Sequence, residues 1–342
     1  MEAIILAGGF GTRLRPLTYS RAKSLLPILN KPMIAHLIEI LPDEVDTIVL
    51  AVNYRKNQIE EYFNENNFGR EIIVNDEPEP LGTGGAVKFA EEHITGKFFV
   101  INSDIICSLN MKKMIDFHEK NNAVTTISLW PVENVSEFGV ADVENNGNIV
   151  GFVEKPKPED APSNFINAGA YIIEPQVLDY INVGGLVSME KEIFPQIIEE
   201  TKRFYGYKFQ GYWMDIGRIT SYLEVHEFLM KRKNLKNVIG KNGKISGKVQ
   251  KTCIGNNVSV GKETEVESCI IYDNAIIGDN CLLNNCVIGE NCNIGGDSEL
   301  NYVVVGDNEV LDKNQKFENK LIWTQPIPAG YPKKQIGNVI GE

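Results

Sequence analysis

Apolar residues follow two different patterns along this chain of 342 residues, and each pattern predicts its own kind of structure. In the first 130 residues, short apolar runs alternate with segments whose apolar residues recur every three or four positions. The runs predict strands at 3–6, 47–53, 71–75, 98–102 and 125–130, and the periodic segments predict helices at 33–41, 55–65, 83–94 and 110–121. This alternation predicts a parallel, doubly wound α/β sheet of the Rossmann-like kind, whose ligands bind beyond the carboxyl ends of the strands.

The pattern changes between about residue 131 and residue 235. Residues 140–156 contain two alternating stretches around Asn145-Asn146-Gly147, which predicts a β-hairpin. Residues 165–175 predict another strand. Residues 219–234 predict an amphipathic helix that ends in three cations, which suits the negative end of a helix dipole.

A second pattern begins at Ile254, where apolar residues recur every 17 positions in steps of six, six and five. Three series keep this spacing: Ile254, Ile271, Ile288 and Val305; Val260, Ile277, Ile294 and Leu311; Val266, Leu283, Leu300 and Phe317. The spacing is typical of a hexapeptide-repeat β-helix, in which each coil is a triangle and stacking buries the inward side chains. Resemblance to the hexapeptide-repeat proteins implies a left-handed, parallel β-helix. We therefore divide the chain into residues 1–235, 236–317 and a tail at 318–342.

The net charge of −12 narrows the range of partners. An acidic chain binds nucleic acids and anionic membranes poorly. No apolar run approaches the roughly 20 residues of a membrane span, and the N-terminus lacks the pattern of a signal peptide. We expect a cytoplasmic protein with neither nucleic acid nor membrane as a partner.

The six cysteines include no C-x-x-C pair, and all four histidines precede residue 227. This distribution argues against a Cys/His zinc site, although a site made of cysteines alone stays open. Within the repeat, Cys269, Cys281 and Cys286 share columns with small residues, so we interpret them as packing residues. The lack of histidine in the repeat argues against a histidine-dependent acyltransferase.

The most informative stretch runs from Leu6 to Pro16 and reads LAGGFGTRLRP. Three closely spaced glycines after an apolar strand let backbone N–H groups approach an anion. Arg13 can bind phosphate oxygens bidentately, and Lys23 and Lys31 follow in the sequel AKSLLPILNKPM. The stretch matches neither the dinucleotide fingerprint nor the P-loop. By itself it could also be an ordinary turn with surface arginines.

The series GGFGTRLRPLT, AKSLLP and KPM resembles the signature of the nucleotide-sugar pyrophosphorylases, which join a sugar 1-phosphate to an NTP. The resemblance implies that Arg13 and Lys23 are catalytic, with Mg²⁺ as the cofactor. A second glycine-rich stretch, PEPLGTGGA at 78–86, is a simple connection or, by resemblance, a wall for the nucleobase. The implied nucleotide-binding residues are Leu6, Ala7, Gly8, Gly9, Gly11, Thr12, Glu77, Leu81 and Gly82.

Two further groups follow from the same resemblance. Glu154 and Lys155 in EKP and Asn167 in NAG match a sugar-phosphate pocket, and Gly139 would let the backbone approach the sugar. Otherwise Glu154 and Lys155 are a solvated pair. Asp104 ends an apolar strand, where a hard carboxylate suits Mg²⁺, although aspartate there is often only a turn former. The resemblance makes Asp215, in GYWMDIG, the second metal ligand.

The form PLGT and the segments SMEKEIFP and GYWMDIG are most like the mannose-1-phosphate guanylyltransferases, which favours GTP and mannose 1-phosphate as substrates. However, Arg218-Ile219-Thr220 replaces the Gln-Pro-Lys usual in that branch, so UTP or dTTP with glucose 1-phosphate stays an alternative. A catalytically silent regulatory subunit is a second alternative, but it would be expected to lose Arg13, Lys23 or an aspartate. We expect a homo-oligomer formed through the β-helix.

Overall fold

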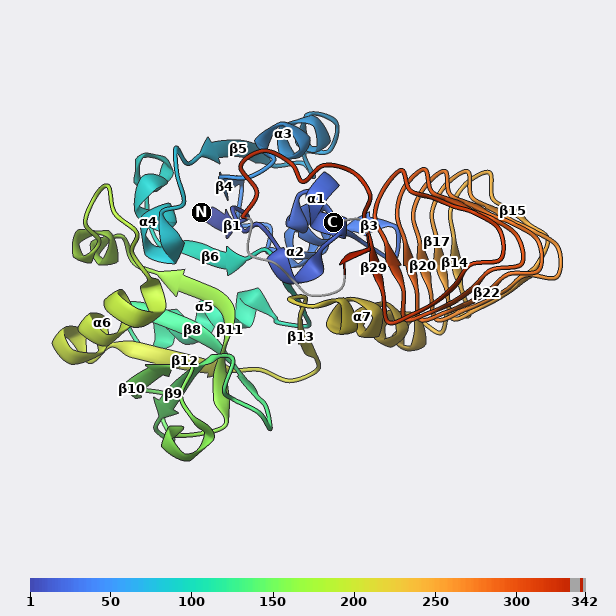
Figure 1. Ribbon diagram of the computed structural model, residues 1–342. Coiled ribbons are helices and arrows are strands. Elements are labelled where there is room, and N and C mark those ends of the chain that lie inside the picture. Colours follow the sequence, from blue (N-terminus) through green and yellow to red (C-terminus); the bar gives the residue numbers. More distant parts are fainter. Residues whose placement is uncertain (333–338, 341–342) are drawn as a thin grey trace. The chain divides into compact units, whose positions relative to one another are not determined.

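The computed structural model describes residues 1–332 and 339–340 (Figure 1). Its contacts divide the chain into two compact units. One combines Met1–Gly9 with Ile34–Met214, and the other combines Phe10–Met33 with Asp215–Glu342. The segment that follows Gly9 therefore packs with the C-terminal part of the chain. The domain boundaries at residues 235 and 317 stay predictions.

The first unit is built on a nine-stranded sheet with the order β10-β9-β11-β6-β1-β4-β5, to which β8 and β12 are added beside β11. Its strands are β1 (Glu2–Leu6), β4 (Thr47–Val52), β5 (Glu71–Asp76), β6 (Phe98–Asn102), β8 (Thr125–Pro131), β9 (Gly139–Val143), β10 (Ile149–Glu154), β11 (Phe165–Ile173) and β12 (Phe204–Lys208). The strands and the hairpin predicted from the sequence are all present, within one or two residues at their ends.

The sheet is mixed, which corrects the expectation of a parallel sheet. Strands β1, β4, β5 and β6 are parallel, as alternating strands and helices require. Strand β11 runs antiparallel to both β6 and β8. It contributes buried residues such as Tyr171 to the core, together with Phe98, Phe194 and Phe204. Its direction was not encoded in the local apolar pattern, because a strand buried on both faces has the same pattern in either direction.

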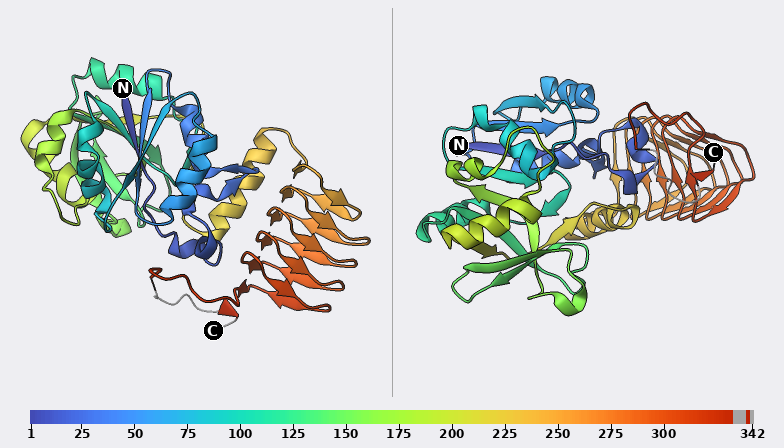
Figure 2. Two further views of the ribbon diagram at one scale, coloured as in Figure 1. Left: turned by 90° about the horizontal axis from the view of Figure 1, so that it is seen from above. Right: turned by 60° about the vertical axis from the view of Figure 1, so that its left-hand side comes forward.

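Helices lie on both sides of this sheet (Figure 2). They are α2 (Met33–Ile40), α3 (Lys56–Glu65), α4 (Gly82–Phe89), α5 (Met111–Lys120) and α6 (Phe194–Thr201). The helix predicted at 83–94 ends at Phe89 and continues only as a 3-10 turn at Glu91–His93. A π-helical turn at Met189–Ile193 leads into α6, and neither was predicted.

The second unit contains a β-helix of three parallel sheets (Figure 2). The first sheet holds β14 (Val238–Ile239), β17 (Cys253–Ile254), β20 (Ile270–Ile271), β23 (Val287–Ile288), β26 (Val304–Val305), β29 (Leu321–Ile322) and β30 (Val339–Ile340). The second holds β15 (Lys244–Ile245), β18 (Ser259–Val260), β21 (Ile276–Ile277), β24 (Asn293–Ile294) and β27 (Val310–Leu311). The third holds β16 (Lys248–Gln250), β19 (Glu265–Glu267), β22 (Leu282–Asn284), β25 (Glu299–Asn301) and β28 (Lys316–Glu318).

The register confirms the repeat of 17 residues. Ile254 pairs with Ile271, Val260 with Ile277, and Val266 with Leu283. The stacked, parallel coils are consistent with the predicted left-handed β-helix. Strands also extend the repeat beyond the predicted end at residue 317, through β29 and β30. Residues 333–338 and 341–342 of the predicted tail lie outside the described residues.

The cysteines of the repeat stack in the predicted columns. The Cys269 N–H donates to Thr252 Oγ1 at 3.2 Å, and the Cys286 N–H donates to Cys269 Sγ at 3.3 Å. All six cysteines of the chain are buried and form no disulfide. Burial raises the pKa of the Cys292 thiol to about 12, so this thiol is inert at neutral pH.

An asparagine ladder lines one corner of the β-helix. Asn257, Asn274, Asn291 and Asn308 adopt φ angles between 55° and 62°. Each of the first three donates its side-chain amide to the next at 3.0 Å. Asparagine suits these turns because it tolerates the left-handed conformation better than most residues do.

Short elements complete the chain: α1 (Leu17–Ser20), β2 (Pro27–Ile28), β3 (Lys31–Pro32), β7 (Ile105–Cys107), β13 (Trp213–Asp215) and α7 (Ile219–Arg232). Strands β7 and β13 form a small sheet of their own, and α7 occupies most of the predicted helix at 219–234. No helix in the described part of the chain has the length and apolar character needed to cross a membrane.

Candidate active site

The carboxyl ends of four parallel strands meet at one edge of the sheet in the first unit. Leu6, the last residue of β1, pairs with Ala51 on one side and Asn102 on the other. Val52 pairs in turn with Asp76 at the end of β5. The register confirms that the predicted loops after these strands start from a common edge, where doubly wound sheets bind their ligands.

The first glycine loop is anchored to its neighbours by backbone hydrogen bonds. The Ala7 N–H donates to the Ala51 carbonyl at 2.8 Å, and the Ser103 N–H donates to the Leu6 carbonyl at 3.2 Å. A Cβ on Gly8 would lie only 3.3 Å from the Asn53 nitrogen. The backbone at Gly8 therefore runs close to the end of β4, as the sequence of small residues predicts.

Glu77 lies beside this loop with a buried carboxyl group. Its side chain is only 6% exposed, and its Oε2 accepts the Leu81 N–H at 3.4 Å. Burial raises the pKa of Glu77 to about 7, and the neighbouring Asp76 raises it further. The carboxyl group consequently changes charge near neutral pH, within the predicted nucleotide-binding residues.

The second glycine-rich stretch packs against a segment more than one hundred residues later. Gly82 has a φ of 74°, and a Cβ there would lie 2.5 Å from the Val187 carbonyl oxygen. The Gly84 N–H donates to that oxygen at 2.8 Å, and the Val187 N–H donates to the Leu81 carbonyl at 2.9 Å. These glycines thus permit close approach of a backbone segment, a role that the sequence did not reveal.

Gly139 and Glu154 of the predicted sugar side face each other across the β9–β10 hairpin. A Cβ on Gly139 would lie 2.3 Å from the Phe152 ring and 2.8 Å from Glu154 Oε2. Burial raises the pKa of Glu154, and nearby Glu190 adds to the increase. The exposed Lys155 keeps its ammonium 3.6 Å from the Glu154 carboxylate, so Lys155 is a cation at the edge of this group.

Asn167 belongs to a hydrogen-bonded network centred on Glu190. Asn167 Nδ2 donates to the Tyr171 hydroxyl at 2.8 Å, and that hydroxyl donates to Glu190 Oε1 at 3.3 Å. Glu190 Oε2 accepts the hydroxyls of Thr83 at 2.7 Å and Ser188 at 2.9 Å. Glu190 therefore links the second glycine-rich stretch to the sugar-side residues.

The sequence interpretation missed Glu190, although it singled out the segment SMEKEIFP that contains it. Three carboxylates and lysines alternate there, and nothing in the order of residues distinguishes Glu190 from Glu192. Only the π-helical turn, which follows the Ser188 N-cap, selects the side chain that turns inward.

The signature segment, defined here as residues 10–33, positions its own cations within the second unit. Gly11 adopts a φ of 64°, and a Cβ there would lie 2.7 Å from Thr18 Cγ2 and 3.2 Å from Lys23 Cβ. The Leu14 N–H donates to the Gly11 carbonyl at 2.8 Å and closes a 3-10 turn that carries Thr12 and Arg13. Lys23 and the turn of Arg13 are thus held around one left-handed glycine.

Arg13 and Asp215 approach each other over Gly217. Asp215 Oδ2 and Arg13 Nη2 lie 2.6 and 2.9 Å from the place that a Cβ on Gly217 would occupy. Any larger residue at this position would displace both side chains. The second unit therefore places one predicted catalytic cation beside one predicted metal carboxylate.

The two predicted metal ligands flank the small sheet, since Asp104 directly precedes β7 and Asp215 ends β13. Both supply the hard oxygen donors that Mg²⁺ prefers. Within residues 1–332 and 339–340, no group of three or more acidic, cysteine or histidine side chains could hold a metal ion. A magnesium ion bound by one or two carboxylates and by substrate phosphates needs no such group, so these residues fit Mg²⁺.

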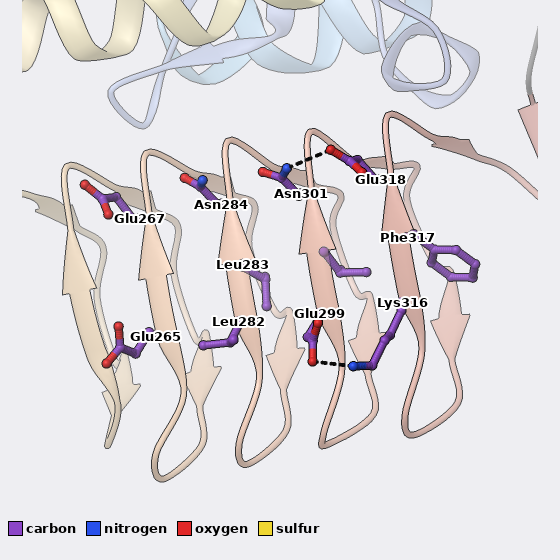
Figure 3. A pocket seen from close by; sticks show the side chains of 11 residues that line it. Glu265, Glu267, Leu282, Leu283, Asn284, Glu299, Asn301, Lys316, Phe317 and Glu318 are labelled. Carbon is purple, nitrogen blue, oxygen red and sulfur yellow. Dashed lines mark hydrogen bonds and ion pairs between the residues drawn. The ribbon is translucent and has the colours of Figure 1, made fainter.

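A shallow hollow of about 610 Å³ lies over the third sheet of the β-helix (Figure 3). Its lining includes Glu265, Glu267, Glu299 and Glu318, of which Glu299 is paired with Lys316 and Glu318 accepts Asn301 Nδ2. The excess of carboxylates would repel a polyphosphate. No histidine lines it, so it offers no base for acyl transfer either.

Comparison with known proteins assigns both parts of the chain. Residues 2–232 match a family described as Nucleotidyl transferase, and residues 234–327 match one described as GMPPB C-terminal domain. The chain is 43% identical over 231 residues to a mannose-1-phosphate guanyltransferase of Saccharomyces cerevisiae, covering 65% of this chain and 63% of that protein. It is 41% identical over 228 residues to a mannose-1-phosphate guanylyltransferase catalytic subunit beta of Drosophila melanogaster, covering 65% and 61%. The matched region is thus less than two thirds of either relative's length.

A solved structure shows the same fold. HddC from Yersinia pseudotuberculosis, complexed with GMP-PN, superposes with a TM-score of 0.57 at 31% identity, covering 67% of this chain and 99% of HddC. The similarity spans the mixed sheet and the glycine loops described above.

Proposed function

This chain belongs to the nucleotidyl transferase family, and we propose that it transfers the nucleotidyl group of GTP to mannose 1-phosphate. The observation that carries the proposal is the similarity to mannose-1-phosphate guanylyltransferases over a region that keeps Arg13, Lys23, Asp104 and Asp215. The products are then GDP-mannose and pyrophosphate. Because the chain spans only part of each relative, the substrates are inferred from likeness alone.

The proposed reaction is a displacement at phosphorus. An oxygen of the sugar phosphate forms a bond to the α-phosphorus of the NTP, and the bond from that phosphorus to the β-phosphate bridging oxygen breaks. Pyrophosphate leaves with the electron pair. The sugar phosphate is already ionised at neutral pH, so the reaction requires no general base, and catalysis consists of positioning and charge neutralisation.

The cations divide this work among them. We assign Arg13 to the β- and γ-phosphates, because its planar guanidinium suits two phosphate oxygens. Lys23 is assigned to the α-phosphate and the leaving group, and Lys155 to the sugar phosphate. Glu154 and Asn167 are assigned to the sugar hydroxyls, a role that fits their place in the network around Glu190.

We assign the binding of Mg²⁺ to Asp104 and Asp215. When bound, the ion would neutralise negative charge on the phosphates. Each aspartate contributes a carboxylate oxygen, and Arg13 beside Asp215 would limit the orientation of that carboxylate.

Two substitutions test the metal assignment. Asp104→Asn and Asp215→Asn should each lower Mg²⁺-dependent pyrophosphate release about 10²–10³-fold, the typical cost of losing one electrostatic partner. Asp142→Asn, on the exposed part of β9, is the matched control and should leave the rate unchanged. Circular dichroism would check that all three variants fold. Near-normal turnover in both test variants would show that these aspartates hold no catalytic metal.

The substrates are tested by pyrophosphate release with four NTPs, each offered with mannose 1-phosphate and glucose 1-phosphate. Product only from GTP with mannose 1-phosphate supports the proposal. Product from UTP or dTTP with glucose 1-phosphate would favour the alternative left open by Arg218-Ile219-Thr220. No product from any pair would favour a silent regulatory subunit.

Two coarser expectations also remain proposals. We propose that the chain forms a homo-oligomer through the β-helix, which exposes apolar side chains such as Ile276, Leu282 and Val310. Light scattering of the full chain would test this. A cytoplasmic location is supported by six buried, unpaired cysteines, because disulfides form in oxidising compartments.

A further inference from the structure

The C-terminal tail folds back onto the signature segment within the second unit. Trp323 and Tyr331 are only 5% and 4% exposed, although both follow the last coil described by the apolar repeat. The Tyr19 ring lies 5.2 Å from the Trp323 ring and 5.0 Å from the Tyr331 ring, and Phe10 packs edge-on against Tyr331 at 5.8 Å. The tail therefore has an apolar docking site on residues that immediately flank the glycine loop.

The Tyr331 hydroxyl reaches the backbone of the loop itself. It donates to the Phe10 carbonyl at 3.0 Å and lies 2.8 Å from Thr18 Oγ1. Thr18 Oγ1 in turn donates to the Gly11 carbonyl at 2.9 Å. Two hydroxyls thus hold two successive carbonyl groups, and the second belongs to the left-handed glycine that precedes the turn of Arg13.

Arg15 completes the contact. Its guanidinium lies 4.6 Å from the centre of the Tyr331 ring, and its Nη2 donates to the Pro332 carbonyl at 2.6 Å. The residue is only 3% exposed, so this cation is withdrawn from solvent by the tail. Arg13 and Arg15, two positions apart, consequently serve different purposes: Arg13 approaches Asp215 over Gly217, whereas Arg15 binds the tail.

We propose that Tyr331 is a positioning residue that fixes the backbone of Phe10 and Gly11 and thereby sets Arg13 and Lys23 for the triphosphate. The inference rests on the proposed function. Lys23 is included because its Cβ lies against the same glycine as Thr18. Binding is reciprocal, so a nucleotide that engages Arg13 and Lys23 must also stabilise the docked tail.

Kinetics of the full-length chain test the proposal. Tyr331→Phe removes the hydroxyl but keeps the ring, and we expect kcat/KM for the NTP to fall about tenfold, since one buried hydrogen bond is lost. Tyr331→Ala also removes the ring, and a loss of about 10²-fold is expected from misplaced phosphate ligands. The KM for the sugar 1-phosphate should stay near the wild-type value. Tyr302→Phe and Tyr302→Ala, at a tyrosine that is 52% exposed on the β-helix, are the matched controls.

A structural role alone would give a different result. Both Tyr331 variants would then melt at a lower temperature, yet kcat/KM for the NTP at 25 °C would equal that of the wild type, and this outcome would overturn the proposal. Thr18→Val supplies a second check because it keeps the shape of the side chain without the hydroxyl. If Tyr331 acts through Thr18, the loss in the double variant with Tyr331→Phe should be smaller than the product of the single losses.

Protection of the tail provides a readout that does not depend on activity. Hydrogen exchange at residues 323–332 should slow when Mg²⁺ and a non-hydrolysable NTP are added to the wild type, and not when they are added to Tyr331→Ala. Absence of this protection in the wild type would refute the positioning role whether or not the chain is active. Protection without NDP-sugar synthesis would instead refute the proposed function and keep the role of the tail.

Discussion

Replacement of Gly82 by alanine tests how the second glycine-rich stretch works. The φ of 74° is a left-handed conformation that costs a residue with a Cβ about 1–2 kcal/mol. The new Cβ would also lie 2.5 Å from the Val187 carbonyl oxygen, so the segment containing Val187 must move away. That movement weakens the bonds from the Gly84 N–H and from the Val187 N–H, each worth about 1 kcal/mol. The local loss therefore sums to about 3 kcal/mol.

Hydrogen exchange measures this loss directly, because protection of an amide reports the free energy of local opening. About 3 kcal/mol corresponds to a roughly 10²-fold loss of protection at the amides of Gly84 and Val187. The KM for the NTP should rise as well, since Leu81 and Gly82 are predicted nucleotide-binding residues. Gly96→Ala is the control, because no atom lies within 4 Å of a Cβ at that position. Unchanged protection in Gly82→Ala would refute the close approach of the two segments.

Two further predictions concern stability. Because burial raises the folded-state pKa of Glu77 from 4.5 to about 7, its ionisation opposes folding: the wild type should lose about 3 kcal/mol of stability between pH 4.5 and pH 7, at about 1.4 kcal/mol per pH unit. Glu77→Gln should remove this loss, and urea unfolding at pH 4.5 and pH 8 would show it as a stability difference between the two proteins that grows with pH. In the β-helix, Asn274→Ala should lower the free energy of unfolding by about 2 kcal/mol, through a strained φ of 61° and two lost ladder bonds. Asn274→Gly should cost less because glycine relieves the strain, and equal losses in urea unfolding would contradict that account.

The parts of the fold that a local pattern encodes could be predicted from the sequence. The strands that end at Leu6 and Asn102 have short apolar runs followed by small or polar residues, and the register places both ends at one edge. The repeat of 17 residues gave the coils and the cysteine columns, because each coil repeats the demands of the one before it. The asparagine ladder has the same spacing in the sequence, so the period could have revealed it as well.

Features that depend on distant contacts could not be predicted. The role of Gly82 depends on Val187, and the importance of Glu190 depends on Thr83 and Tyr171. In each case the partners are tens of residues or more apart, and a turn-forming residue or a surface-type glutamate has many possible roles. The tail is a similar case, since only the structure places Tyr331 against the glycine loop.

The charges of the signature segment show why the order of residues alone cannot identify ligand-binding cations. Five cations lie in this segment: Arg13, Arg15, Arg21, Lys23 and Lys31. Burial alone would lower the pKa of Arg21, but Asp307 and Glu290 raise it above its ordinary value, and Arg21 Nη2 lies 2.6 Å from Glu290 Oε2.

Arg21 therefore stays charged and fastens the segment to the β-helix, just as Arg15 fastens it to the tail. Both contacts are made by residues more than 260 positions away, so a sequence reader sees five equivalent cations. The second unit separates them physically, because partners in the same unit neutralise the cations that fasten the segment. An acidic chain can then present positive charge to a triphosphate only where its own carboxylates are few or, as at Asp215, are assigned to a metal ion.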